Sequence, residues 1–194
     1  MQNIDKIKLH WPNNSVYFLT GSTFLHYPYF KTNEQKQIVL NQIKKLKDKL
    51  NIKIIAYSIA INHYHLKFYL KSGLDIAKVK QLMHGGVTFK YKKEYKMKYR
   101  EMWQSKKVLV ITSDEMDWKT TGYIIGNLLK HKEVSTFEEL ENDSFSSYKF
   151  IVKRYSDECA QELVRKVINV DESIEGEVDF KNLKKLSIIR PKIY

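Results

Sequence analysis

The chain has 194 residues, of which 43% are hydrophobic, and a formal net charge of +12. This hydrophobic content excludes a disordered chain and is enough for one globular domain with its own core. The beginning of the chain lacks the apolar stretch of a signal peptide, and no segment reaches the length of a membrane span. The single cysteine, Cys159, excludes an internal disulfide and a cysteine-rich zinc site, so we expect a reducing, cytoplasmic setting. The positive charge favours a polyanionic partner, most simply nucleic acid.

The first seventy residues predict a strand, a helix and a pair of strands. Residues 16–23 are aromatic and β-branched, which is typical of a strand. Thr32 or Asn33 can cap a helix that continues to about residue 50, because apolar residues recur there at helical spacing. Two further strands are predicted over residues 52–61 and 63–70, and Asn62 lies where they join.

The rest of the chain predicts more helices and one more strand. Asp75 can begin a helix that reaches Met83 and extends at most to Tyr99. Ser113 can cap a long helix. The remaining predicted segments are a strand over 103–112, the helix from 114 to about 132, short helices over 136–141 and 156–168, and a tail from 172 to 194 without a clear period. This order predicts an α+β fold in which helices cover one face of an antiparallel sheet.

Two histidines form the first pattern that carries chemistry. His63 and His65 are two residues apart on a predicted strand, so both imidazoles point to the same face. Tyr64 points to the other face, which we expect to be the core. Two such imidazoles can bind one metal ion, since neutral histidine is the commonest metal-ligating side chain. The alternative is a pair of surface or hydrogen-bonded histidines.

Tyr123 and Asn127 form the second pattern. They are four residues apart on a predicted helix, so they lie one turn apart on the same face. Tyr123 offers a phenol, and Asn127 offers a hard carbonyl oxygen suited to Mg²⁺ or Mn²⁺. A packed tyrosine and a solvated asparagine are the alternative, and spacing alone does not single out Tyr123 among thirteen tyrosines.

A basic and aromatic stretch runs from residue 90 to residue 107. Its cations can follow a phosphate backbone, and aromatic rings can stack on unpaired bases. For its tyrosines at 91, 95 and 99 we favour packing on the core, and for its cations we favour phosphate contacts. We expect six cations to bind nucleic acid. One is Lys67, on the strand that carries the two histidines, and the others are Lys90, Lys92, Lys93, Lys96 and Arg100.

Four segments in order resemble the HUH superfamily of single-tyrosine transposases, and the REP-associated tyrosine transposase branch most. The run AYSIAINHYHLKFYL resembles the segment that ends in histidine, a bulky apolar residue and histidine. The run GYIIGNLLKHKEV resembles the nucleophile helix, where Asn or Gln follows the tyrosine by four residues. Trp103-Gln104 and the segment FSSY at 145–148 are also similar to family segments. Order and spacing agree from about Tyr17 to Tyr148.

The resemblance implies a ferredoxin-like HUH-endonuclease fold over residues 1–150, followed by a C-terminal helical extension and tail over 151–194. It implies that His63, His65 and Asn127 bind Mg²⁺ or Mn²⁺ and that Tyr123 is the nucleophile. The implied activity is cleavage and rejoining of single-stranded DNA through a 5′-phosphotyrosine intermediate, with recognition of a DNA hairpin. We expect a monomer or a homodimer and no membrane partner.

The sequence departs from the family pattern at two places. Ala60-Ile61 stand where Met-Pro usually precedes the Asn-His pair, and Leu128 replaces a proline after Asn127. Without that proline the helix can run further. Neither change removes a reactive group.

A second class of function is a non-catalytic nucleic-acid-binding domain derived from such a transposase, because a four-stranded sheet with basic helices can simply bind RNA or DNA.

Overall fold

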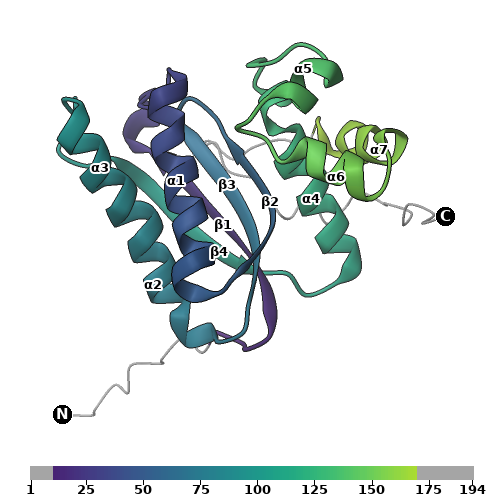
Figure 1. The fold of residues 1–194 in the computed structure, drawn as a ribbon, viewed down its shortest axis with the longest axis horizontal. Coiled ribbons are helices and arrows are strands. Elements are labelled where there is room, and N and C mark those ends of the chain that lie inside the picture. Colours follow the sequence, from purple (N-terminus) through teal and green to yellow (C-terminus); the bar gives the residue numbers. More distant parts are fainter. Residues whose placement is uncertain (1–10, 170–194) are drawn as a thin grey trace, which may run out of the picture.

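The computed structural model describes residues 11–169 and contains one four-stranded sheet (Figure 1). Neighbouring strands are antiparallel throughout, in the order β2-β3-β1-β4. The chain is therefore α+β with a ferredoxin-like strand order, as predicted. The strands are β1 (Ser15–Thr23), β2 (Lys53–Ile59), β3 (His63–Leu70) and β4 (Trp103–Val110).

Helices connect the strands and follow the last one. The helices before β4 are η1 (Phe24–His26), α1 (Asn33–Leu50), η2 (Gly73–Asp75), α2 (Ile76–Lys80), the π-helical turn η3 (Gln81–Gly85) and α3 (Gly86–Glu94). The helices after it are α4 (Asp114–Lys130), α5 (Phe137–Asn142), α6 (Tyr148–Arg154) and α7 (Asp157–Val167). None of the described helices is long and apolar enough to cross a membrane.

Local sequence signals fix the ends of the two longest helices. Thr32 and Gln35 form a capping box at the start of α1, and Asn51 ends that helix in a left-handed conformation at φ 50°. The Ser113 hydroxyl accepts a hydrogen bond from the Met116 amide (3.1 Å) at the start of α4. At its far end α4 continues past Asn127 to Lys130, as the missing proline allows.

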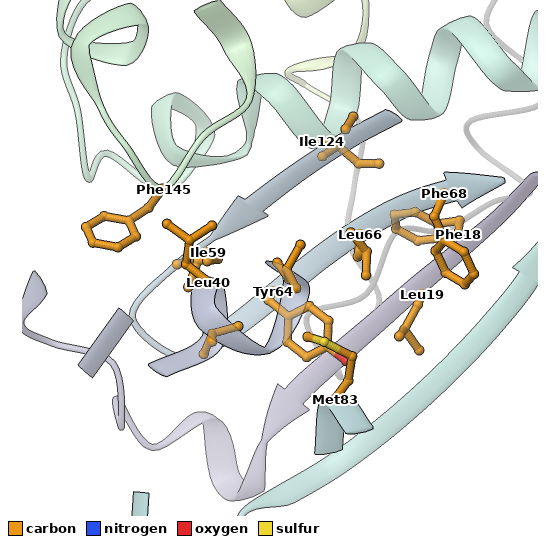
Figure 2. Close-up of a cluster of buried hydrophobic side chains, with 14 of the residues drawn as sticks. Phe18, Leu19, Leu40, Ile59, Tyr64, Leu66, Phe68, Met83, Ile124 and Phe145 are labelled. Atoms are coloured by element: carbon orange, nitrogen blue, oxygen red, sulfur yellow. The ribbon is translucent and has the colours of Figure 1, made fainter. Parts of the chain in front are cut away.

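Helices cover both faces of the sheet, which corrects the prediction that they cover one. Figure 1 shows α1, α2 and α3 on one side and α4 with α5–α7 on the other. In Figure 2, Met83 and Ile124 reach the sheet from opposite sides. As a result, the side chains on both faces of β3 are buried. Tyr64 is buried on one face, and His63 and His65 are buried on the other. The alternation of β3 separates the two faces correctly, but the polar face is also inside the protein.

Several element boundaries differ from the predicted ones. The helix expected from Asp75 is interrupted by the π-helical turn and ends at Glu94. Asp75 stands at its first position, but its carboxylate pairs with Lys78 (2.9 Å) and does not cap the backbone. Helix α6 has no counterpart among the predicted elements. The predicted tail, 172–194, lies outside the described residues.

The C-terminal helix α7 packs directly on α4. A side-chain atom added at Gly122 would lie 2.5 Å from the Leu163 carbonyl oxygen, and one added at Gly126 would lie 2.6 Å from the Val164 side chain. The two glycines therefore allow the helix backbones to approach closely. They occupy one side of α4, so that α4 is held between the sheet and α7.

Candidate functional site

The four residues of the two predicted patterns meet between β3 and α4. The ring centroids of His63 and His65 are 5.0 Å apart, and those of His65 and Tyr123 are 5.1 Å apart. The Asn127 side-chain oxygen lies 3.0 Å from Nε2 of His63. The histidine pair, the phenol and the amide oxygen thus form one cluster within a single chain.

Ordinary element geometry produces this convergence. Alternation on β3 places His63, His65 and Lys67 in one row beneath α4. At the start of α4, Asp117 and Thr121 contact Lys67, whereas Asn127 near its end contacts His63. Helix α4 therefore runs antiparallel to β3 above this row. The helical repeat then brings Tyr123 over His65 and Asn127 over His63.

The hydrogen bonds of His63 imply a proton or a cation beside its Nε2 atom. The side-chain nitrogen of Asn62 donates to the His26 carbonyl (3.3 Å), so the Asn62 oxygen accepts from Nδ1 of His63 (2.7 Å). A neutral His63 then carries a lone pair on Nε2, and this lone pair faces the Asn127 oxygen at 3.0 Å. Two lone pairs at this distance repel each other unless a proton or a cation lies between them. An outer hydrogen bond of this kind commonly orients a metal-binding histidine.

The donor set fits a divalent cation. It comprises two imidazoles and one amide oxygen, which suit ions of intermediate to hard character. Among residues 11–169, no group of three or more His, Cys, Asp and Glu side chains could hold a metal, so an amide oxygen is needed to complete this set. The amide nitrogen of Asn127 is buried without a hydrogen-bond partner in the described structure. His63, His65 and Asn127 are therefore the residues that could hold Mg²⁺ or Mn²⁺.

The cluster is closed in this structure. His63 is 4% exposed, Tyr123 is 2% exposed, and His65 and Asn127 are fully buried. The His65 ring also stacks on Phe18, with ring centroids 5.4 Å apart. A substrate phosphate could contact these groups only after Tyr123 or part of α4 moves.

Lys67 is buried in the same row, which corrects the expectation that it contacts nucleic acid. Its ammonium nitrogen pairs with the Asp117 carboxylate (2.8 Å) and donates to the Thr121 hydroxyl (2.7 Å). Burial lowers the pKa of Lys67 to about 8, although the neighbouring Asp117 carboxylate acts in the opposite direction. Lys67 therefore joins β3 to the first turns of α4.

A second ion pair, which sequence reasoning missed, holds the other end of α4. Lys36 of α1 pairs with the Glu133 carboxylate (2.6 Å), and both side chains are largely buried. The second oxygen of Glu133 accepts from the Ile61 amide (2.9 Å) in the turn just before His63. This contact joins three distant segments next to the histidine strand. We refer to Lys36, Glu133 and Ile61 as the Glu133 clamp.

Lys130 and His131, which follow Asn127 in the chain, also contact the cluster and were not predicted. The His131 ring lies 4.6 Å from the His63 ring, centroid to centroid. The Lys130 ammonium group lies 5.3 Å from the centroid of the Tyr123 ring, a cation–π arrangement. The sequence signal for both is helical spacing, because His131 follows Asn127 by four residues and Lys130 follows Tyr123 by seven.

The basic stretch covers part of α3, the segment after it and the first residues of β4, and α3 packs on the face of the sheet opposite Tyr123. Its tyrosines pack as expected, with Tyr91 buried and its ring 5.3 Å from that of Tyr29. Lys90 is half-buried and lines a polar groove between α1 and α3 that also contains Glu34 and Glu94. The exposed cations of the predicted set are Lys92, Lys93, Lys96 and Arg100.

Comparisons with known proteins bear on the family and the fold of the chain. The profile of a family described as "Transposase IS200 like" matches residues 23–127, more than half of the chain. The solved structure of a REP-associated tyrosine transposase bound to a REP hairpin is 19% identical, with a TM-score of 0.62 over 75% of this chain and 83% of that one. A putative transposase from Deinococcus radiodurans R1 is 14% identical, with a TM-score of 0.44 over 56% of this chain and 87% of that one.

A comparison with curated protein sequences gives no match. The likeness to the hairpin-bound structure confirms the predicted fold. The matched range 23–127 includes His63, His65, Tyr123 and Asn127, the residues on which the resemblance rests. The chain belongs to the IS200-like transposase family.

Proposed function

We propose that this transposase cleaves and rejoins single-stranded DNA with Tyr123 as nucleophile and with Mg²⁺ or Mn²⁺ held by His63, His65 and Asn127. The observation that supports the proposal most is the convergence of these four side chains within one chain, with the Tyr123 and His65 rings 5.1 Å apart. A hairpin is the proposed recognition element, because the similar transposase structure is of a protein bound to one.

The chain's own residues supply the attacking group and its orientation. The Tyr123 oxygen attacks the phosphorus, the bond to the 3′-oxygen of the upstream fragment breaks, and the downstream fragment stays on the tyrosine through its 5′-phosphate as a phosphodiester. The phenol loses its proton, and the leaving 3′-oxygen takes one up. Attack by a 3′-hydroxyl on the phosphotyrosine reverses the step and joins strands. When bound, the divalent ion would neutralise charge on the phosphate and orient it.

The burial of the cluster adds a requirement for access. Because Tyr123 is 2% exposed, its side chain must turn outward or the end of α4 must move before a phosphate can meet the oxygen. An unpaired strand suits such a site better than a duplex, since it can bend sharply into a narrow opening.

A covalent adduct tests the proposal. The protein is incubated with labelled hairpins that carry single-stranded flanks of random sequence, in the presence of Mn²⁺, and is then denatured. We expect a labelled adduct that is lost in Tyr123→Phe, because only the hydroxyl is removed. Hairpin binding without an adduct would instead indicate a non-catalytic binder. Cleavage that persists in Tyr123→Phe would indicate that water is the nucleophile.

The role of the histidines is tested separately. We expect His65→Ala to lose adduct formation and to retain most hairpin binding, because its imidazole is fully buried beneath α4. The two properties are measured on the same hairpins by denaturing gels and by fluorescence anisotropy. Equal loss of both would show that His65 has only a structural role.

A further inference from the structure

An exposed ridge on α3 combines an aromatic ring with cations. Phe89 is 68% exposed, which is unusual for a phenylalanine on a regular helix. Lys92 and Lys93 follow it by three and four residues, so their side chains lie beside the ring on the same helical face. We refer to Phe89, Lys92 and Lys93, with Gly85 one turn earlier, as the α3 ridge.

Gly85 leaves one end of the ridge without a side chain. A side-chain atom added at this position meets nothing within 4 Å, and its backbone is helical at φ −67°. Neither packing nor backbone conformation therefore requires a glycine. In contrast, Gly86 has Gln42 at 2.8 Å from such an atom. An exposed helical glycine with no structural reason allows another molecule to approach the backbone closely.

The local helix geometry and charge point in the same direction. The ridge begins at the π-helical turn η3, and such turns are frequent at functional sites. Glu94, the acidic residue of α3, lines the groove toward α1 together with Lys90. The exposed ridge thus presents two cations and one flat apolar ring. A partner with negative charge and flat apolar faces complements this surface.

We propose that the α3 ridge binds unpaired DNA, with a base stacked on Phe89 and phosphates beside Lys92 and Lys93. A single strand has both required features, whereas a duplex keeps its base faces covered. The inference rests on the proposed function for the identity of the nucleic acid. It adds a base-stacking contact on the opposite face of the sheet from Tyr123.

Two oligomers of equal charge separate stacking from electrostatics. The full chain is titrated into labelled oligothymidylate and into an abasic oligomer of the same length. Wild-type protein should bind oligothymidylate more tightly than it binds the abasic oligomer. We expect Phe89→Ala to weaken binding to oligothymidylate about 5- to 150-fold, the range for loss of one stacked base, and to leave abasic binding unchanged. The double variant Lys92→Ala, Lys93→Ala should weaken binding to both oligomers. It should also reduce the slope of log K against log salt concentration by about 0.7 per lysine.

Matched variants exclude effects of misfolding. Phe150→Ala removes another exposed phenylalanine, 52% exposed on α6 with Lys149 over its ring, and should leave both affinities unchanged. Gly85→Gln places a neutral side chain in open space and should raise the melting temperature, since glutamine favours a helix more than glycine does. It should nevertheless weaken binding to oligothymidylate. Ala77→Gln, at an exposed position of α2, should leave binding unchanged.

Either of two outcomes would overturn the inference. One is an equal affinity of wild type and Phe89→Ala for oligothymidylate. The other is self-association of wild type in sedimentation that Phe89→Ala abolishes, which would make the ridge a protein interface. Both are independent of the Tyr123 adduct, so failure here is distinguishable from failure of the proposed chemistry.

Discussion

His84 lies on the face of the sheet opposite Tyr123 and is almost completely buried. Burial first, and then the positive charges of Lys106 and Lys80, lower its pKa to about 3. Burial also raises the pKa of Tyr64, so the Tyr64 hydroxyl remains protonated and donates to Nε2 of His84 (2.8 Å). The residue between the two candidate metal ligands is therefore joined to the helical turn before α3.

We expect His84 to make the protein sensitive to acid. Its folded pKa is depressed below the ordinary value of 6.5, so the unfolded chain binds the proton first and stability falls as pH decreases through the window from about 6.5 to about 3. Between pH 7 and pH 4 the loss from this group should be roughly 3 kcal/mol. Urea unfolding at both pH values should show a smaller loss in His84→Gln, which keeps an acceptor for Tyr64. Equal losses in both proteins would contradict a neutral, buried His84.

Among single residues, sequence predicted the shared faces that follow from local spacing. His63 and His65 share a face by strand alternation, and Tyr123 and Asn127 share one by helical repeat, so no long-range contact was needed to pair them. The family resemblance then joined the two pairs. Lys67 was assigned wrongly because alternation shows which residues share a face, but not whether a helix covers that face.

At the scale of elements, the Glu133 clamp fixes the end of α4 against the turn before His63. We expect Glu133→Gln to lower the free energy of unfolding by about 3 kcal/mol, because it leaves the largely buried ammonium group of Lys36 without its charge partner. Combining it with Lys36→Met should recover most of this loss. Urea unfolding of the two single variants and the double variant measures the coupling.

The exposed pair Lys166 and Glu162 on α7 provides a control. Glu162→Gln should change stability by less than about 0.5 kcal/mol, since exposed ion pairs on a helix contribute little. If Glu133→Gln were no more costly than Glu162→Gln, the clamp would not hold these elements together.

The contact between α4 and α7 predicts opposite effects for two glycine substitutions. Alanine normally stabilises an exposed helical position by up to about 1 kcal/mol relative to glycine. Gly85→Ala, in open space, should show this gain. Gly122→Ala should instead destabilise by about 1–3 kcal/mol, because its new atom would lie 2.5 Å from the Leu163 carbonyl oxygen and the helices must separate. Melting temperatures of the two variants test this, and a gain in both would exclude close packing of α7 on α4.

Elements with strong periodic or capping signals were predictable, and those set by tertiary contacts were not. The Thr32 and Ser113 caps place the starts of α1 and α4 within one residue. Helix α6, of seven residues, was missed because it is too short for a clear apolar stripe. The Lys36–Glu133 pair joins residues 97 positions apart, a distance over which sequence pattern carries no signal.

At the scale of the whole molecule, two ion pairs hold α4 on the sheet of its own chain, and α7 covers the outer side of α4. Lys67 binds Asp117 near its start, the Glu133 clamp binds just beyond its end, and α7 packs along its glycine side. An exchange of α4 together with the residues that follow it would have to break both ion pairs, whereas α7 could move with α4. We therefore expect each chain to contain a complete site. A single chain should then be functional, whether or not it associates with a second one.

Mixing two inactive variants tests this directly. Tyr123→Phe lacks the nucleophile and His65→Ala lacks a candidate ligand, so neither alone should form an adduct. A swapped dimer would pair the intact Tyr123 of one chain with the intact histidines of the other and restore up to about a quarter of wild-type adduct after random reassociation. Because α4 is fixed on its own sheet, we expect the equimolar mixture to stay inactive, with an equal amount of wild type showing that the hairpin is competent. Restored adduct in the mixture would place Tyr123 in the partner's site and would require the Lys67–Asp117 and Lys36–Glu133 ion pairs to open during assembly.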